Sequence, residues 1–284
     1  MTKSKTNPLQ SKHTINLRGE IIDLSKPKVM GIINLTPDSF YGGSRKSGDD
    51  VLHTAEQMLE EGATFLDLGG YSSRPGAENV SEEEELRRVI APITSIMKQF
   101  PDAVISIDTF RSKVAREAVD AGAGLVNDIS AGHLDKDMFE TVANLGVPYI
   151  AMHMRGTPQT MKTMVDYEDI LREVIKYFSN TLADCNQMGI KDVIIDPGFG
   201  FAKTAEQSFH LLNHLEHFQW LERPVLVGVS RKSMIYRTLN LTAQEALNGT
   251  TALNTLALFK GAGILRVHDV KEAIETIKLV EQLN

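Results

Sequence analysis

The sequence predicts an α/β protein built as a single (β/α)8 TIM barrel with a short N-terminal hairpin. Eight apolar runs typical of buried strands alternate with segments that have a helical period near 3.6. Each run stops on polar or charged residues, although packing alone gives a buried strand no reason to end there. In a parallel barrel the carboxyl ends of the strands converge on one face, where catalytic groups collect. The sequence therefore predicts one polar pocket at that face.

The strand candidates follow a distinct N-terminal region. Residues 1–14 are a polar tail, and residues 15–24 are predicted to form a hairpin that turns at Arg18–Gly19 and covers the bottom of the barrel. Because no linker or low-complexity stretch divides the rest, residues 15–284 are expected to form one barrel domain. The eight runs and their polar ends are VMGIIN at Asn34, FLD at Asp67, VISID at Asp108, LVND at Asn127–Asp128, YIAMH at His153, VIID at Asp196, VLVGVSRK at Ser230–Lys232 and ILRVHD at Arg266–His268.

Helical segments connect these runs. Several end in glycine shortly before the next strand, as in EGATFLDL and KGAGILRVHD, which is typical of a left-handed helix cap. The segment at Ser81 begins SEEEE. Its carboxylates could form a metal cluster, but at a helix start they more often complement the helix dipole, and Ser81 and Glu84 can form a capping box. The expected helices cover residues 50–61, 81 onward, 111–120, 137–144, 170–188, 208–217, 249–260 and 271–282.

Composition excludes several classes of function. A net charge of -7 argues against a nucleic-acid-binding surface, which is usually strongly basic. No apolar stretch approaches the roughly 18 residues of a membrane span, and the polar N-terminus lacks the apolar core of a secretory signal. The single cysteine, Cys185, excludes an internal disulfide and a multi-cysteine metal site. We therefore expect a soluble, cytoplasmic protein with no nucleic-acid or membrane partner.

Three strand ends favour a particular kind of ligand. Asp108 and Asp196 are carboxylates, and each can accept two parallel hydrogen bonds from a planar group with two adjacent donors. A 2-aminopyrimidinone ring presents such an edge, and the amide of Asn127 could complete its recognition. The alternative is that these residues cap helices, as Asp108 could do before Thr109–Phe110. Because three such residues share one rim, we expect a flat nitrogen heterocycle to bind there.

Two loops near the strand ends carry further candidate groups. NLTPDSF at residues 34–40 is followed by Gly42–Gly43, and this turn chemistry predicts a mobile lid at the barrel mouth. Ser72, Ser73 and Arg74 supply hydroxyl and guanidinium donors between flexible residues. They are suited to binding an anion, although an ordinary surface loop would have the same composition.

The last two strands indicate an anion site. Residues 230–233, SRKS, lie at a strand-to-helix junction, where backbone N–H groups favour a carboxylate or phosphate. Arg266 and His268 are two residues apart in a strand and therefore point the same way. Two cations beside the final strand match the usual phosphate position of this architecture.

Other motifs have weaker interpretations. IDPGFGFAK at residues 195–203 resembles a glycine-rich phosphate loop, but Pro197 argues against a dinucleotide fingerprint. Its glycines instead permit a turn that projects Phe201 over the mouth, and Met152 could contact a flat ring. Three histidines share one helical face and could in principle bind a metal, but apolar residues on the opposite face indicate a solvated surface: His210, His214 and His217.

Together the motifs resemble those of the dihydropteroate synthase family. They occur in the family's order over residues 29–272: NLTPDSF, LDLGGYSSRPGA, SIDT, LVNDIS, MHMRGTPQTM, IDPGFGFAK, VGVSRKS and RVHDVKE. The resemblance implies an enzyme that condenses 6-hydroxymethyl-7,8-dihydropterin diphosphate with p-aminobenzoate, giving 7,8-dihydropteroate and diphosphate in folate biosynthesis. It also implies Mg²⁺ as cofactor and a homodimer as the assembly.

The resemblance further implies roles for individual residues. The pterin pocket that it implies consists of Asp108, Asn127, Met152, Asp196, Lys232 and Arg266. The positions that it implies around p-aminobenzoate are Phe40, Ser73, Arg74, Pro75, Phe201 and Ser233. The catalytic group that it implies consists of Asn34, Asp67, Lys232, Arg266 and His268, with Asn34 as the protein ligand to Mg²⁺.

An arylamine is already neutral and nucleophilic at pH 7, so the main expected catalytic effect is stabilisation of the departing diphosphate by Mg²⁺, Arg266 and His268. Two alternatives are a pterin-dependent methyltransferase barrel, which would not use a diphosphate site, and a catalytically silent pterin-binding protein. Tyr71 and Ser73 stand where many family members carry Glu and Thr. These departures concern affinity for p-aminobenzoate and its sulfonamide mimics.

Overall fold

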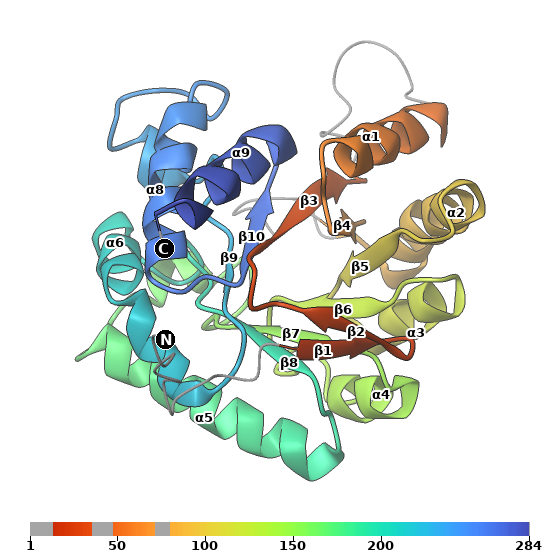
Figure 1. Cartoon of the computed structure of the whole chain (residues 1–284). Helices are drawn as coiled ribbons and strands as arrows, with labels where there is room; N and C mark the ends of the chain where they lie inside the picture. The colour runs from red at the N-terminus through yellow and green to blue at the C-terminus, as the bar shows by residue number, and fades with distance from the viewer. Residues whose placement is uncertain (1–13, 36–47, 72–79, 284) are drawn as a thin grey trace, which may run out of the picture.

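Eight parallel strands form a barrel in the computed structural model, which describes residues 14–35, 48–71 and 80–283. The hydrogen-bonded order is β8-β7-β6-β5-β4-β3-β10-β9, and a parallel bridge between Ile195 and Val225 links the two ends of this sheet. The predicted (β/α)8 fold is confirmed (Figure 1). The strands are β3 Lys28–Asn34, β4 Phe65–Gly69, β5 Val104–Asp108, β6 Leu125–Asp128, β7 Tyr149–Met152, β8 Val193–Asp196, β9 Leu226–Val227 and β10 Ile264–Val267.

The predicted hairpin precedes the barrel, with β1 Thr14–Leu17 pairing antiparallel to β2 Glu20–Asp23. Its two turn residues, Arg18 and Gly19, have φ of 54° and 92°, as a type I′ turn requires. Figure 1 shows the hairpin lying across one end of the strands. The division into a tail of residues 1–14 and a barrel of residues 15–284 stays a prediction. The apolar side chains that fill this end come from the hairpin region (Ile15, Leu17, Leu24) and from the strands (Met30, Phe65, Leu125, Ile150, Ile194, Leu226, Ile264).

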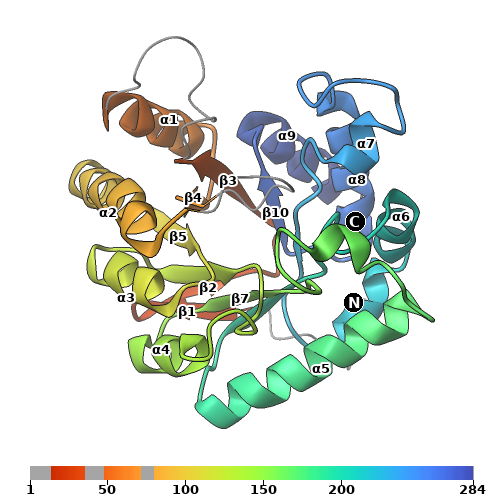
Figure 2. The same cartoon turned by 180° about the vertical axis from the view of Figure 1, so that it is seen from behind.

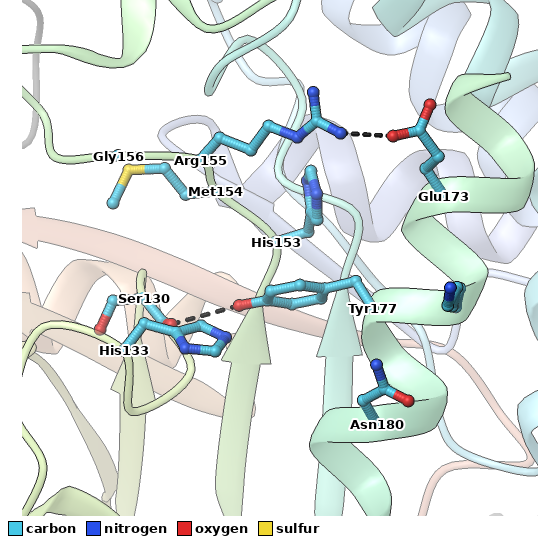
Figure 3. A pocket seen from close by; sticks show the side chains of 10 residues that line it. Ser130, His133, His153, Met154, Arg155, Gly156, Glu173, Tyr177 and Asn180 are labelled. Carbon is cyan, nitrogen blue, oxygen red and sulfur yellow. Dashed lines mark hydrogen bonds and ion pairs between the residues drawn. The ribbon is translucent and has the colours of Figure 1, made fainter. Parts of the chain in front are cut away.

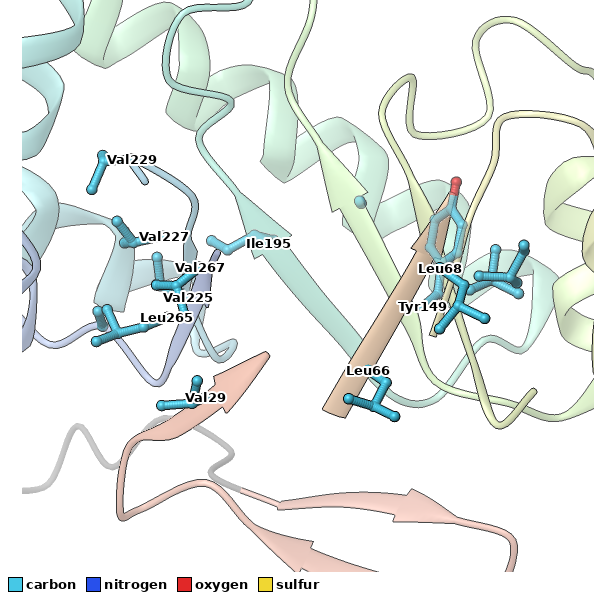
Figure 4. Close-up of a cluster of buried hydrophobic side chains, with 14 of the residues drawn as sticks. Val29, Leu66, Leu68, Tyr149, Ile195, Val225, Val227, Val229, Leu265 and Val267 are labelled. Carbon is cyan, nitrogen blue, oxygen red and sulfur yellow. The ribbon is translucent and has the colours of Figure 1, made fainter. Parts of the chain in front are cut away.

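The two sides of each strand have different partners, because successive residues of a strand point to opposite faces. Outward-facing residues such as Leu66, Val227 and Leu265 join the main apolar cluster between the strands and the surrounding helices (Figure 4). On several strands, the inward-facing residue two positions after the apolar layer at the bottom of the barrel is polar. This change from apolar to polar places the functional groups inside the barrel near its carboxyl face: Asp67, Ser106, Asn127, Asp196 and Arg266.

Helices surround the barrel in both views (Figures 1 and 2). Most of the predicted helices are confirmed within a few residues, and Ile170–Met188 agrees at both ends. The observed helices are α1 Gly48–Glu60, α2 Glu82–Gln99, α3 Ser112–Asp120, α4 Met138–Leu145, α5 Ile170–Met188, α6 Ala205–Asn213, α7 Ser233–Tyr236, α8 Leu247–Phe259 and α9 Val270–Glu281, with short 3-10 helices at Met161–Thr163 and Leu215–Leu221.

The predicted helix over residues 208–217 is wrong in its bounds. A capping box between Thr204 and Gln207 starts α6 earlier, and His214 leaves the α-helical conformation and separates α6 from a 3-10 helix. At Ser81 only half of the predicted box forms. The Ser81 side chain accepts from the Glu84 amide at 3.2 Å, but the Glu84 carboxylate pairs with Arg88 at 2.8 Å. No helix in the described ranges is long and apolar enough to cross a membrane.

Candidate active site

A charged cluster lies at the inward ends of β4, β5, β6 and β10. The Arg266 guanidinium donates from Nε to Asp67 Oδ2 and from Nη2 to Asp108 Oδ2, both at 2.6 Å. Asn127 Nδ2 donates to both Asp67 oxygens, at 3.1 and 3.3 Å. We call these four residues the central cluster. The strands thus bring together predicted residues that are up to 199 positions apart in the sequence.

In the central cluster, the carboxylates of Asp67 and Asp108 both bind the single guanidinium of Arg266. Burial raises the pKa of Asp108 to about 7, because the attraction of Arg266 does not offset the desolvation and the repulsion from Asp67. Burial alone would lower the pKa of Arg266, but Asp67 and Asp108 outweigh it and the net shift is upward. Arg266 therefore stays charged, while Asp108 can exchange a proton near neutral pH. Asp108 caps no helix, because Arg111 holds the N-cap position of α3.

A second pair of ionisable groups flanks the cluster. Asp196 is 5% exposed at the inward end of β8, where its Oδ1 accepts from the Gly198 amide at 2.8 Å. Lys232 precedes α7; its Nζ donates to the Phe199 carbonyl at 2.6 Å and lies 4.9 Å from the centre of the Phe201 ring. Burial raises the pKa of Asp196 and lowers that of Lys232 to about 8, and each charge opposes the shift of the other.

Ser230 and His268 face each other across the last two strands. Ser230 Oγ lies 3.0 Å from His268 Nδ1 and accepts from the His268 amide at 3.1 Å. Asn34 ends β3 on the inward side, half-buried, and pairs in register with Gly69 of β4. Arg231, expected beside them, instead turns away and binds Asp269 at 2.7 and 2.9 Å. Ser230 and His268 are therefore held together, whereas Arg231 contributes no side chain to the pocket.

Two other strand ends also do not enter the pocket, because each lies one position beyond an inward-facing residue. Asp128 is fully buried and accepts from the Tyr149 hydroxyl and from the amides of Ser130 and Gly132, each at 2.7 Å. His153 turns toward Lys203, whose Nζ lies 2.8 Å from His153 Nδ1. The expectation that every polar strand end serves one pocket does not hold for these residues. The side chains of Asp128 and His153 lie outside the barrel and hold the segments at the rim of the pocket through these contacts.

Several predicted residues complete the surroundings, and others lie beyond the described ranges. Met152 is buried, with Ala202 and the partly buried Phe201 in its apolar cluster, and Ser233 is the first residue of α7. The predicted lid beyond Leu35 and the predicted anion-binding loop fall outside the described residues, as do four of the predicted p-aminobenzoate positions, which stay predictions: Phe40, Ser73, Arg74 and Pro75.

Sequence reasoning missed a buried ion pair beside Tyr71. Glu85, taken only as a helix-dipole partner, is fully buried and binds Arg111 Nη1 at 2.5 Å and Thr109 Oγ1 at 2.7 Å. The Arg111 guanidinium lies 5.4 Å from the Tyr71 ring centre, and the Tyr71 hydroxyl accepts from Gln159 at 2.8 Å. The residue types alone carry no signal of this contact, since Glu85 lies in a run of four glutamates.

A cavity of about 480 Å³ lies between α5 and the segments that follow β6 and β7 (Figure 3). His153 and Tyr177 line it, and the Tyr177 hydroxyl donates to the Ser130 carbonyl at 3.2 Å. Arg155 at its edge pairs with Glu173. No residue of the central cluster lines this cavity, so it is separate from the strand-end pocket.

The chain is similar to known dihydropteroate synthases over most of its length. The "Pterin binding enzyme" family matches residues 30–268. The dihydropteroate synthase of Escherichia coli strain K12 is 44% identical, over 93% of this chain and 94% of the relative. A Yersinia pestis dihydropteroate synthase with a sulfonamide drug has a TM-score of 0.90 and 41% identity, covering 95% of this chain and 98% of that one. A Xanthomonas albilineans dihydropteroate synthase in complex with 7,8-dihydropteroate has a TM-score of 0.86 and 35% identity, covering 95% and 98%.

The barrel and the family match define a pterin-binding transferase. The chain belongs to the pterin binding enzyme family and, within it, to the dihydropteroate synthases of folate biosynthesis. The family, the fold and the enzymatic function predicted from the motifs are thereby confirmed.

Proposed function

We propose that the strand-end pocket joins a dihydropterin diphosphate to p-aminobenzoate, with the pterin ring held by Asp196, Lys232 and the central cluster. This assignment rests on one observation: these ionisable groups lie together inside one end of the barrel. Asp196 and Lys232 have shifted pKa values, and Arg266 binds Asp67 and Asp108. The X. albilineans relative in complex with 7,8-dihydropteroate supports a site for the joined product.

Asp196 is the proposed acceptor for the amino-pyrimidinone edge of the pterin. This edge has two adjacent N–H donors, which match the two oxygens of a carboxylate. One Asp196 oxygen already accepts from the Gly198 amide, which fixes the orientation of the carboxylate. The neighbouring Lys232 charge favours the ionised form of Asp196 that this role requires. Lys232, with a pKa of about 8, is mostly protonated at pH 7 and can donate to an acceptor on the ring.

The leaving diphosphate would lie toward Arg266 and His268. In the reaction the amine nitrogen forms a bond to the pterin methylene carbon, the carbon–oxygen bond to diphosphate breaks, and the amine loses a proton. Negative charge grows on the departing oxygen, so fixed donors there stabilise the transition state more than the substrate. Ser230 holds the His268 ring in place for this role, and Asp67 and Asp108 hold Arg266.

Mg²⁺ fits the residues present if the diphosphate supplies most of its ligands. Mg²⁺ prefers oxygen ligands and is usually bound through one or two protein groups together with substrate phosphates and water. Asn34 offers an amide oxygen at the inward end of β3, and within the described residues its side chain makes no hydrogen bond to another protein group. Bound Mg²⁺ would neutralise charge on the departing diphosphate. Asn34 would hold the ion at the mouth, where the chain itself offers no carboxylate cage among the described residues.

The p-aminobenzoate would approach past Phe201 and Ser233. The Phe201 ring lies against the Lys232 ammonium, and Ser233 follows Lys232 at the start of α7. The amine would thus enter beside the same lysine that contacts the pterin. Phe40, Ser73, Arg74 and Pro75 stay proposed contacts on the basis of the family motifs.

The predicted homodimer is also a proposal, and α8 supports it. Leu247–Phe259 is largely apolar, yet only one part of it is buried on the barrel, and Phe259 is 53% exposed. Leu239 and Leu241, in the segment before α8, are 48% and 39% exposed. Exposed apolar residues of this size often mark an interface. Light scattering after size-exclusion chromatography would give twice the chain mass, and a monomer at micromolar concentration would refute the dimer.

Diphosphate release tests the function directly. Purified protein should release diphosphate only when the dihydropterin diphosphate and p-aminobenzoate are both present, and the rate should depend on Mg²⁺. A methyltransferase would instead transfer a methyl group from a methylated folate and release no diphosphate. A silent pterin-binding protein would bind the pterin without turnover. Either result would refute the proposal.

A further inference from the structure

Lys203 is a buried lysine that the proposed reaction does not use. It is only 7% exposed, and its Nζ contacts three backbone carbonyls: Gly198 at 3.0 Å, Phe201 at 2.9 Å and His153 at 3.2 Å. The fourth contact is His153 Nδ1 at 2.8 Å. No carboxylate oxygen of the described residues lies within hydrogen-bond distance of this Nζ. Burial lowers the pKa of Lys203 well below its usual value, and the attraction of Asp196 offsets this only in part, so a lysine buried in this way is costly.

The contacts of Lys203 span two segments that lie side by side. One is the end of β7 at His153, and the other is the turn after β8, residues 197–202. At Gly198, where φ is +67°, an added Cβ would lie 2.2 Å from the His153 carbonyl oxygen, so the turn is pressed against the end of β7. Ala202 also has positive φ, at 47°, which is unfavourable for a residue with a side chain. The turn therefore needs further contacts to keep its shape. Lys203 supplies two of them, to the Gly198 and Phe201 carbonyls, and joins the turn to His153.

The opposite side of the same turn forms part of the pterin pocket. The Gly198 amide donates to Asp196, and the Phe199 carbonyl accepts from Lys232. The Phe201 ring borders the Lys232 ammonium. The turn thus connects the proposed acceptor for the pterin edge to the proposed donor, and Lys203 holds it from behind.

We propose that Lys203 is a positioning residue for pterin binding, which acts through the backbone of residues 198–201 on Asp196, Lys232 and Phe201. The reason to keep a buried lysine here is geometric. A single Nζ placed among three carbonyls fixes their separations, which an apolar side chain of the same length cannot do. This inference rests on the proposed pterin site.

The test is Lys203→Met, which keeps the length of the side chain and removes its donors. We expect the dissociation constant of a bare pterin, measured by calorimetry, to rise at least about tenfold, since the turn loses the donor that links its Gly198 and Phe201 carbonyls to the end of β7. The KM for the pterin substrate should rise similarly, whereas kcat should change less. Hydrogen–deuterium exchange should increase within residues 196–203. The matched control is Lys176→Met, which removes an exposed lysine of α5 on the same side of the barrel and should change none of these quantities.

A purely structural role predicts different results. Lys203→Met would then lower the melting temperature, or raise exchange throughout the barrel, without changing pterin affinity, and that result would overturn the inference. Where the variant fails to fold, His153→Leu provides a second test. It removes one acceptor of Lys203 from outside the pocket and should raise the pterin dissociation constant by a smaller factor; unchanged affinity in this variant would also overturn the inference. Failure of the proposed function is distinguishable, because the unmodified protein itself would then neither bind pterin nor release diphosphate.

Discussion

Replacing Asp108 by Asn should stabilise the ligand-free protein at alkaline pH while impairing its function. Asp108 shares the Arg266 guanidinium with Asp67, at 2.6 Å from each carboxylate, so one cation faces two buried anions. Asn has nearly the shape of a protonated Asp and carries no charge. It therefore removes the repulsion and the desolvation that raise the Asp108 pKa, and it leaves the Arg266–Asp67 pair intact.

The size and sign of the effect follow from the pKa. The pKa of Asp108 rises from 3.8 to about 7 on folding. Between these two values the unfolded chain has lost the proton and the folded protein keeps it, so the free energy of unfolding falls as pH rises through this window. A shift of this size corresponds to roughly 4 kcal/mol, an order-of-magnitude figure at 1.36 kcal/mol per pH unit. The loss should be complete above pH 8 and absent below pH 4, and the Asn variant should not show it.

Urea unfolding of the ligand-free proteins at pH 5 and pH 8 measures the difference. We expect the stability of Asp108→Asn relative to the wild type to be greater at pH 8 than at pH 5 by roughly 3 kcal/mol, because pH 5 to 8 covers about two pH units of the window at 1.36 kcal/mol each. Carboxyls that do not interact with Asp108 titrate equally in both proteins and cancel in this comparison. Asp102→Asn, at an exposed residue, is the control and should show no pH-dependent difference. Equal destabilisation of Asp108→Asn at both pH values would refute the charge argument.

Three further predictions follow from other contacts. Asp196→Asn places an amide donor against a ring donor and should weaken pterin binding by on the order of 2–4 kcal/mol in a calorimetric titration, and unchanged affinity would remove Asp196 from the pocket. Because the pKa of Lys232 is about 8, pterin affinity should fall as pH rises through that value, and Lys232→Arg should move this fall to higher pH; a flat profile up to pH 10 would contradict the role of its charge. Tyr149→Phe removes a 2.7 Å hydrogen bond to buried Asp128 and should lower the free energy of unfolding by about 1–3 kcal/mol without changing pterin affinity, as urea unfolding can measure.

Much of the architecture could be predicted because it depends on local patterns. The apolar runs, the glycine caps and the Arg18–Gly19 turn each carry a signal within a few residues, and the strand ends that they define include Asp67 and Arg266. Because successive side chains of a strand point to opposite faces, the sequence also predicts whether each strand end points into the barrel, but only once one inward-facing residue of that strand is known. The apolar runs do not show which residues face inward, so the strand-end pattern predicts Asp128 and His153 at the pocket rim, whereas their side chains lie outside it.

The missed contacts are of another kind, because they join segments that no local pattern relates. Lys203 follows a glycine-rich turn and resembles an ordinary loop lysine until the end of β7 is placed beside it. Glu85 is one of four consecutive glutamates, and only the packing of α2 against α3 distinguishes it from its exposed neighbours. Residue type and spacing could not identify these partners, since burial decides their roles.

Two sets of ionisable residues surround the strand ends, and they differ in the groups that stabilise their charges. Outside the barrel, Asp128 receives hydrogen bonds from Tyr149, Ser130 and Gly132, and these fixed donors offset part of the desolvation that raises its pKa. Inside, Asp108 has a pKa of about 7 and Lys232 of about 8, so both lie close to neutralisation at physiological pH. A chain selected only for stability would have no reason to keep the inner set, because apolar residues of similar size are often at least as stable there. A ligand with adjacent donors and acceptors would supply the partners that the inner set lacks, which explains why polar residues persist in a barrel whose lower half is filled by apolar side chains.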